Sequence, residues 1–502
     1  MSPTMNQPDP HPSDERAAHG VPQPEAEAQL GLNVTPLRAL LRREAVIVPP
    51  DASILAAAQL MREQRVSSLL LVEDQRLVGI VTDRDLRNRV LADALPLTGP
   101  VREIATADPL CVDVRGTAFD ALLLMARHNI HHVPVMDGLR ITGVVTASDL
   151  NLQPDNSAVF LAGDIHRQTD ITGLARASAH IRQLQGHLAA ADATAYATAH
   201  IITAITDALT TRLLALAEAQ WGPPPVAYAW VAAGSQARGE QTAKSDQDNC
   251  MILDDGFDAP RHGEYFERLA RYVCGGLDAC GYIYCPGDIM AMNDAWRQPL
   301  RRWQQYFRRW IDEPEPQALV NSGVFFDQRR VHGDVALLDQ LRADVLRRTA
   351  GNALFLAHMA GNALGRGPPL GLFGGITPQR RGEHPDTVDL KYQGIVPIID
   401  LARVHALAGG HAAVNTHERL QVAWHGGDIS EQGARDLRDA LEFLAVTRIR
   451  HQARQIEANV AADNFLSLHE LSNFERTQLK DAFAVVRAVQ QLLGQRYRGA
   501  VL

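Results

Sequence analysis

The chain has 502 residues, which is enough for about three or four domains. Its formal net charge of −9 gives no overall attraction to a nucleic-acid backbone, which argues against nucleic acid as a partner. Five cysteines without a CxxC pair argue against a disulfide framework or zinc site and for a reducing compartment.

The beginning of the chain, residues 1–34, is rich in Pro, Asp, Glu and His and has no apolar run. It predicts a disordered lead rather than a signal peptide. No later stretch approaches the roughly eighteen uncharged apolar residues of a membrane span. The best candidate, 394–410, is interrupted by Asp400, Arg403 and His405. A soluble, cytoplasmic protein that does not enter a membrane is expected.

An internal repeat occupies residues 35–152. Residues 37–86 and 101–150 align without a gap at a constant offset of 64 residues. The segment Gly-Ile-Val-Thr-Asp-Arg-Asp at 79–85 falls on Gly-Val-Val-Thr-Ala-Ser-Asp at 143–149. Each copy predicts a short strand, a helix, two β-branched strands and the start of a second helix.

The end of each copy carries chemistry. A Thr hydroxyl and an Asp carboxylate three residues apart, at a strand-to-helix turn, can bind a ribose diol, and the helix N-terminus favours phosphate. The alternative is that both residues only cap the helix. The repeat resembles a tandem pair of CBS domains, and such pairs commonly dimerise, so the resemblance implies a homodimer. It also implies an adenine nucleotide between the copies, held by Thr82, Asp85, Thr146 and Asp149. The copies differ beside these residues, with Asp83-Arg84 in the first and Ala147-Ser148 in the second, so the two sites should differ.

Residues 153–225 predict a helical connector, rich in Ala and Leu, that ends at three consecutive prolines. An apolar strand follows at 226–232, then Gly234-Ser235 and, after a loop, Asp246 and Asp248 at the start of a second strand.

The Gly-Ser turn and the acidic pair are the strongest functional signal of the chain. Glycine lets the backbone N–H groups of a turn approach a phosphate closely, because a Cβ would block it. Asp246 and Asp248 stand two apart beside a strand, so their side chains point to the same face. Two converging carboxylates can hold Mg²⁺ ions that bridge a triphosphate and activate a hydroxyl. The alternative is an exposed turn ahead of a strand.

This segment resembles the polymerase-β nucleotidyltransferase superfamily, and within it the PII-protein uridylyltransferase type with its GS-x-x-R-x-E and SDxD motifs. The resemblance implies a catalytic domain at 226–340. Gly234, Ser235 and Arg238 would bind the nucleotide phosphates and Asp246 and Asp248 the metal, while Glu240 fixes the loop.

The superfamily usually adds a third carboxylate from a later strand. Asp327 is the choice, because Val324-Phe-Phe-Asp predicts an Asp at the end of an apolar strand and resembles the family's D-x-R segment. Asp288 and Asp294 remain alternatives.

Residues 341–502 predict a helical C-terminal domain with a Gly/Pro-rich interruption. The run from Asp389-Leu-Lys391 to Arg403 resembles the C-terminal domain of a bacterial family that joins CBS pairs to such catalytic units. Lys391 and Arg403 either contact nucleotide or target, or form salt bridges within the helical bundle.

The expected architecture is therefore multidomain, α/β and α+β: a tandem CBS pair, a polymerase-β-type nucleotidyltransferase domain and a helical domain. The expected function is Mg²⁺-dependent transfer of NMP from NTP to a protein or small-molecule hydroxyl in signal transduction, regulated by adenine nucleotide at the CBS pair. The chain lacks the His-Asp dipeptide of an HD phosphohydrolase that full-length PII uridylyltransferases carry, which leaves the acceptor open. A non-catalytic nucleotide sensor that docks partners is the alternative. Transfer to an RNA end is disfavoured by the acidic charge.

Overall fold

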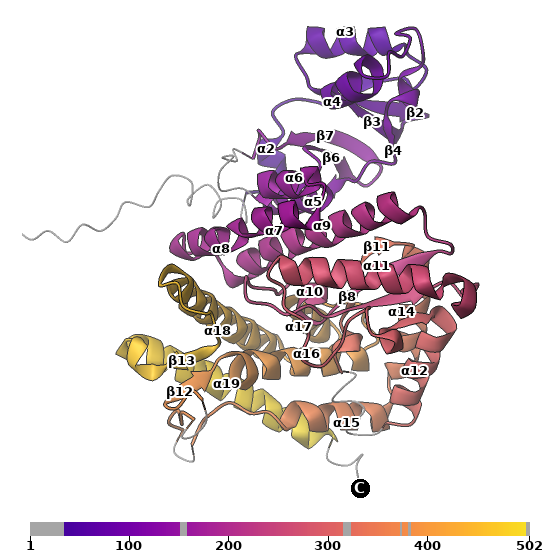
Figure 1. Ribbon diagram of the computed structural model, residues 1–502. Helices are drawn as coiled ribbons and strands as arrows, with labels where there is room; N and C mark the ends of the chain where they lie inside the picture. The colour runs from indigo at the N-terminus through magenta and orange to yellow at the C-terminus, as the bar shows by residue number, and fades with distance from the viewer. Residues whose placement is uncertain (1–34, 151–157, 315–322, 372–373, 380–382, 498–502) are drawn as a thin grey trace, which may run out of the picture.

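The computed structural model describes residues 35–150, 158–314, 323–371, 374–379 and 383–497 (Figure 1). The predicted lead at 1–34 lies outside the described residues.

Two equivalent units open the described chain, and they confirm the tandem CBS pair. Strand order is β1-β2-β3-β4 in the first and β5-β6-β7 in the second. The register is the same in both, with a β-bulge at Leu71/Val72 in the first copy and at Val135/Met136 in the second. The elements of the first copy are β1 Ile47–Val48, α3 Ile54–Gln64, β2 Ser68–Glu73, β3 Arg76–Thr82, α4 Asp83–Asp85 and β4 Thr106–Ala107, and those of the second are β5 Val112–Asp113, α5 Ala118–His128, β6 His132–Asp137 and β7 Arg140–Thr146, with the short helix α2 Leu37–Leu40 ahead of both.

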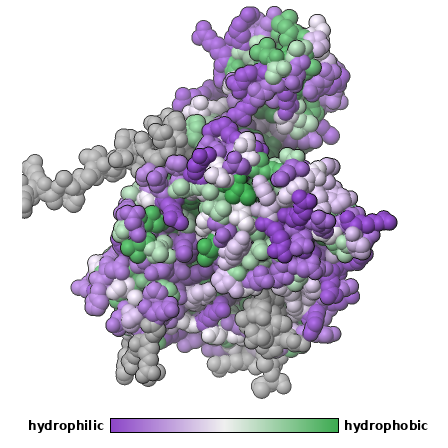
Figure 2. All heavy atoms as spheres, viewed as in Figure 1, coloured by the Kyte–Doolittle hydropathy of each residue, from purple (hydrophilic) through white to green (hydrophobic). Residues whose placement is uncertain are grey.

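The two copies bury their apolar side chains differently. The first copy has a small core of its own, built around Ile54, Leu69 and Val81. The core of the second copy continues without a break into the helices and sheet that follow it. Figure 2 accordingly shows the first copy as a lobe that projects from the body.

Four helices occupy the predicted connector: α6 Ala158–Arg167, α7 Ile171–Ser178, α8 His180–Ala190 and α9 Ala195–Trp221. The long helix α9 has the length and composition of a membrane span, a candidate that the search for uncharged stretches missed. However, 67% of its most apolar window is buried inside the protein. It packs against α5, α6 and α11, which makes it a core helix that joins the second copy to the catalytic domain.

The predicted catalytic domain is built on a four-stranded sheet of order β10-β9-β8-β11. Alternate residues of β8 face two different cores, as the two-residue period of a strand requires. Tyr228 and Trp230 pack on the side of α9 and α11, whereas Ala229 and Val231 pack on the side of the C-terminal helices. The elements are β8 Tyr228–Ala233, α10 Gly234–Arg238, β9 Asn249–Leu253, α11 Ala259–Ala279, β10 Arg297–Pro299, α12 Leu300–Asp312, β11 Gln328–Gly333 and α14 Val335–Thr349.

One predicted strand of this domain is wrong. The apolar run before Asp327 forms a 3-10 turn, Gly323–Phe326, and the strand β11 begins only after Asp327. The reason is that Phe325 and Phe326 pack into the core from the turn, beside Trp303, Trp310 and Phe307.

The C-terminal domain is helical, with one two-stranded sheet, and it covers the edge of the catalytic domain at which α10 begins (Figure 1). Its core is continuous with one face of the catalytic sheet, so the two domains form one packed unit. The elements are α15 Ala353–Leu364, β12 Thr387–Asp389, a helical turn Lys391–Ile395, α16 Val396–Ala408, α17 Thr416–His425, α18 Glu431–Glu457, β13 Phe465–Ser467 and α19 Asn473–Tyr497.

Candidate functional site

The turn from β8 into α10 brings Gly234 against the acidic pair. Gly234 has φ +55°, and a Cβ at this position would lie 2.5 Å from a carboxylate oxygen of Asp248. A side chain here would therefore be strained by its backbone and would also displace the carboxylate. The sequence predicts that Gly234 leaves room for a phosphate. In the structure the missing side chain leaves room for the carboxylate of Asp248.

Asp246 and Asp248 converge, as their spacing predicts. Their carboxylate oxygens and the Sγ of Cys285 all lie within 4.8 Å of one another. Gln247 between them is buried, and its side-chain amide donates to the carbonyls of Cys274 and Tyr282 at 3.0 Å, which turns both aspartates to the opposite side. Burial and the neighbouring charge of Asp246 raise the pKa of Asp248 to about 6.

The donor set fits a hard divalent cation. Two carboxylates with open solvent beside them are what Mg²⁺ usually takes from a protein, with water and substrate phosphates as its other ligands. Burial and Asp248 raise the pKa of the Cys285 thiol to about 12. A protonated thiol is a poor ligand for Mg²⁺, so Asp246 and Asp248 are the residues that would hold the ion.

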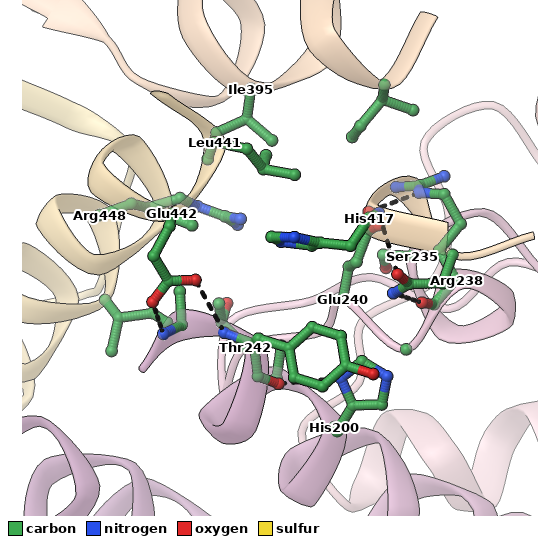
Figure 3. Close-up of a pocket in the computed structure, with 18 of the residues that line it drawn as sticks. His200, Ser235, Arg238, Glu240, Thr242, Ile395, His417, Leu441, Glu442 and Arg448 are labelled. Carbon is green, nitrogen blue, oxygen red and sulfur yellow. Dashed lines mark hydrogen bonds and ion pairs between the residues drawn. The ribbon is translucent and has the colours of Figure 1, made fainter. Parts of the chain in front are cut away.

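The acidic pair opens onto a cavity of about 530 Å³ between the catalytic and C-terminal domains. The catalytic domain contributes Gly234 and Ser235 to its wall, together with the two aspartates, and the C-terminal domain contributes Arg366, Lys391 and Tyr392 among others. A smaller, more enclosed pocket adjoins it on the far side of Ser235 (Figure 3).

Arg238 lies beside both cavities, but its guanidinium is already engaged. Nε donates to Glu240 at 2.6 Å and Nη1 donates to Asp327 at 2.6 Å. Glu240 in turn accepts from the backbone N–H of Thr416 at the start of α17, and Asn415 donates to the carbonyl of Arg238. Glu240 thus fixes the loop, as the resemblance implies, whereas these contacts make Arg238 a bridge to the C-terminal domain rather than a free phosphate ligand.

The structure corrects the role expected for Asp327. Its side chain is fully buried and accepts hydrogen bonds from Arg403 at 2.9 and 2.6 Å, from Arg419 at 2.5 Å and from Arg238 at 2.6 Å. Burial alone would raise the pKa of Asp327, but the three arginines together hold it well below its usual range. Both oxygens are occupied, so Asp327 joins domains and is not a third metal ligand or a base.

The two alternatives for a third carboxylate also lie apart from the acidic pair. Asp288 accepts a hydrogen bond from Asn293 at 2.8 Å, and the mostly exposed Asp294 pairs with Arg297 at 3.1 Å. Among the described residues, the third potential ligand atom beside the pair is the Sγ of Cys285. Its contact with Asp248 spans a loop, and no spacing rule in the sequence points to it.

The motif that ends the first CBS copy lines a cavity of about 360 Å³, which also takes Asn129 and His132 from the second copy. Thr82 donates its hydroxyl to Asp85 at 2.7 Å, and Asp85 also accepts from the Thr82 N–H, so both residues do cap the helix. Arg84 lies on the same cavity wall.

The second motif makes the same cap, with the Thr146 hydroxyl donating to Asp149 at 2.6 Å. Neither residue lines the cavity of the first motif. The segment that follows, 151–157, lies outside the described residues.

A buried aspartate connects the second copy to the catalytic turn. Asp207 of α9 accepts from Gln236, inside α10, at 3.0 Å and from Arg329 of β11 at 2.9 Å. Its other oxygen lies 3.0 Å from Nε of Arg127, the α5 residue two positions before Asn129 of the CBS cavity. That contact lacks hydrogen-bond alignment and acts through charge. Contacts therefore run from Arg127, two residues along the chain from the CBS cavity, through Asp207 to the turn that carries Ser235.

Family models match three segments of the chain. The model described as "Putative nucleotidyltransferase DUF294" matches residues 179–317, a span that begins at α8. "Putative nucleotidyltransferase substrate binding domain" matches residues 353–497, and "CBS domain" matches 37–92 and 101–152.

Individual relatives match over the CBS copies. The uncharacterized protein YlbB of Bacillus subtilis is 34% identical over 20% of this chain and 69% of its own length. The CBS domain-containing protein YhcV of the same organism is 33% identical over 20% of this chain and 74% of its own. Among solved structures, the CBS domain protein PAE2072 from Pyrobaculum aerophilum, complexed with AMP, is 33% identical, with a TM-score of 0.22 over 23% of this chain and 89% of that one.

Proposed function

The chain belongs to the family that joins a CBS pair to a nucleotidyltransferase domain of the DUF294 type and its substrate-binding domain, and on this premise we propose that it transfers an NMP group from an NTP to a hydroxyl. The observation that carries the proposal is the convergence of Asp246 and Asp248 at the Gly234 turn, on the wall of an interdomain cavity. The acceptor is a hydroxyl of a protein or of a small molecule.

Mg²⁺ would supply charge neutralisation on the triphosphate and lower the pKa of the attacking hydroxyl. Asp246 and Asp248 would hold the ion beside the N-terminal end of α10. The Gly234 turn sets the distance between these two carboxylates and Ser235. The acceptor oxygen forms a bond to the α-phosphorus, the bond from that phosphorus to the bridging oxygen breaks, and pyrophosphate leaves. The hydroxyl proton is released to water. No covalent intermediate is needed, since positioning and charge suffice for this reaction.

We test the proposal with each of the four α-labelled NTPs, Mg²⁺ and cell lysate. Label should appear on a partner in the presence of Mg²⁺, and the double change Asp246→Asn with Asp248→Asn should abolish it. Asp254→Asn, at a solvent-facing turn just beyond β9, is the matched control. Transfer that survives the double change would overturn the mechanism. Absence of transfer by wild type with every NTP would favour the non-catalytic sensor.

Regulation by an adenine nucleotide is the second part of the proposal. Thr82, Arg84 and Asp85 offer hydroxyl, cation and carboxylate to a ribose phosphate, and the contact from Arg127 to Asp207 to Gln236 gives occupancy a route to the catalytic turn. The effect of AMP or ATP on the transfer rate checks this. A rate that no adenine nucleotide changes would contradict it.

A homodimer is the third part of the proposal. The first copy exposes several large apolar side chains, Ile47, Leu91 and Leu97 among them, which a partner copy would cover. Light scattering should give twice the mass of one chain, and Leu91→Glu with Leu97→Glu should return it to one. A single-chain mass for wild type would contradict the dimer.

A further inference from the structure

Arg448 of α18 is a buried cation without an ion-pair partner among the described residues. It is 8% exposed, and within the described part of the chain its guanidinium makes one hydrogen bond, from Nε to the side chain of Asn464 at 2.7 Å. Burial lowers its pKa to about 10. The neighbouring buried arginines differ, since Arg238, Arg403 and Arg419 all share Asp327. The carboxylate of Asp389 acts on Arg448 through charge, but it forms no ion pair with it and instead accepts the backbone N–H groups of Lys391 and Tyr392. A desolvated guanidinium without a directly paired anion is unfavourable, which points to an anion that arrives from outside.

The Arg448 side chain points into the enclosed pocket beside the interdomain cavity (Figure 3). That pocket has a volume of about 80 Å³, and two carboxylates line it. Both are committed elsewhere: Glu442 accepts from the N–H groups of Ala195 and Tyr196 at the start of α9, and Glu240 is held by Arg238. Neither is free to neutralise Arg448.

Lys391 connects this pocket to the acidic pair. It lines both the pocket and the interdomain cavity. Its Nζ lies 5.5 Å from the centre of the Tyr392 ring and has no hydrogen bond or ion pair with the described residues. Burial and the charge of Arg448 lower its pKa. Lys391 and Arg448 thus present two positive charges on the wall that starts at Asp246 and Asp248 and ends in the pocket.

A triphosphate requires positive charges that are not already neutralised, and Lys391 and Arg448 meet this requirement better than Arg238 does. The sequence predicts that Arg238 binds the phosphates, but Glu240 and Asp327 already neutralise its charge. The enclosed pocket has a volume of about 80 Å³ and the interdomain cavity one of about 530 Å³, so the cavity offers more room for the nucleoside and the pocket suits the smaller phosphate end.

We propose that Lys391 and Arg448 form a receptor for the terminal phosphates of the NTP, supplied by the C-terminal domain. This inference rests on the proposed function. With the α-phosphate at the acidic pair, the β- and γ-phosphates run past Ser235 and Lys391 and end at Arg448. The pyrophosphate product leaves from the same place, and both cations stabilise the charge that builds on it as the bond breaks.

The test measures binding of inorganic pyrophosphate to the full chain by calorimetry, with NMP as a second probe. Lys391→Met and Arg448→Gln should each weaken pyrophosphate binding about tenfold, since a charge-assisted contact to phosphate is removed. NMP binding should change less than about twofold by the same reasoning. Arg435→Gln, an exposed position on α18, is the matched control and should change neither. Unchanged pyrophosphate binding in both variants would overturn the proposal, as would an equal loss for NMP.

Two further readouts separate this proposal from its rivals. If Arg448 only supports the fold, Arg448→Gln should lower the melting temperature; removal of an unpaired buried charge should instead leave it unchanged or raise it. A non-hydrolysable NTP should compete with pyrophosphate. Simultaneous binding of both would assign the pocket to a phosphorylated acceptor and overturn the proposal. Neither readout requires transfer activity, so failure of the transfer assay and failure of this receptor are distinguishable.

Discussion

Two buried aspartates hold the catalytic turn α10 from opposite sides, and they differ in how tightly. Asp327 accepts a hydrogen bond from Arg238 at the end of the turn. It also accepts hydrogen bonds from two arginines of the C-terminal helices α16 and α17. Asp207 accepts a hydrogen bond from Gln236 in the middle of the turn and forms an ion pair with Arg127 of the second CBS copy.

The partners of Asp327 are nearly inaccessible, since the Arg403 and Arg419 side chains are 8% and 2% exposed. Arg127 is 31% exposed at its side chain and meets Asp207 by charge alone. The difference suggests a division of labour. We infer that the joint at Asp327 keeps its geometry, and our proposal of regulation requires the joint at Asp207 to change when the CBS cavity is filled.

Asp327→Asn should have the largest effect. It removes the carboxylate that three buried guanidinium groups share. Arg238 keeps Glu240 and Arg403 keeps Asp400, whereas Arg419 loses the one carboxylate it pairs with among the described residues. The free energy of unfolding should therefore fall by more than about 3 kcal/mol. Urea unfolding followed by tryptophan fluorescence measures this, because all six tryptophans lie outside the CBS copies. Asp312→Asn, which breaks an exposed ion pair with Arg348, is the control and should cost less than about 1 kcal/mol. Equal losses of unfolding free energy in the two variants would contradict the claim that Asp327 contributes more to stability than an exposed ion pair.

Arg127→Ala should cost less stability, about 2 kcal/mol, because Asp207 keeps Arg329 and Gln236. Its main effect should be on coupling: the transfer rate should no longer respond to adenine nucleotide. The control is Glu63→Ala. Glu63 is an exposed residue of α3 and occupies the position in the first copy that Arg127 occupies in the second. That control should change neither quantity, and a nucleotide response that persists in Arg127→Ala would show that the joint at Asp207 does not transmit.

Arg84→Ser gives the first copy the residue that the second copy carries at Ser148. Loss of this cation from the cavity wall should weaken AMP binding about tenfold by calorimetry. The reciprocal change Ser148→Arg should leave binding in the described cavity unaltered. An effect of Ser148→Arg as large as that of Arg84→Ser would mean that the nucleotide binds elsewhere.

The smallest predicted effect concerns pH at the C-terminal joint. Burial lowers the pKa of His417, in α17, from 6.5 to about 4. The unfolded chain therefore binds a proton that the folded chain does not, so stability is full above pH 6.5 and falls as the pH drops towards 4. Between pH 7.5 and 5.5 the loss from this residue is about 1 kcal/mol. His417→Gln should reduce the acid-induced loss of unfolding free energy, measured by urea unfolding at the two pH values, by that amount. A loss as large as in wild type would contradict it.

The sequence predicts well whatever depends on short spacing. The 64-residue repeat anticipates two copies that share even their β-bulge, and the spacing of Asp246 and Asp248 anticipates their convergence. The first signal is the self-similarity of the sequence and the second is the two-residue period of a strand, and neither needs knowledge of distant contacts.

Contacts between distant segments are what the sequence could not predict. Asp327 looks like a catalytic carboxylate because the arginines that neutralise it lie 76 and 92 residues further along the chain. Cys285 reaches Asp248 from another loop, and the pocket of Arg448 exists only once α18 packs against α9. The partners that decide these roles come from distant segments of the chain, and their pairing is set by tertiary packing.

The most direct test of the central claim is the Mg²⁺ dependence of NTP binding, which requires no knowledge of the acceptor. A non-hydrolysable NTP analogue is titrated into wild type and into Asp248→Asn, with Mg²⁺ and with chelator. Wild type should bind at least about tenfold more tightly with Mg²⁺, and the variant should show no such gain. An equal gain from Mg²⁺ in both proteins would contradict the assignment of the acidic pair.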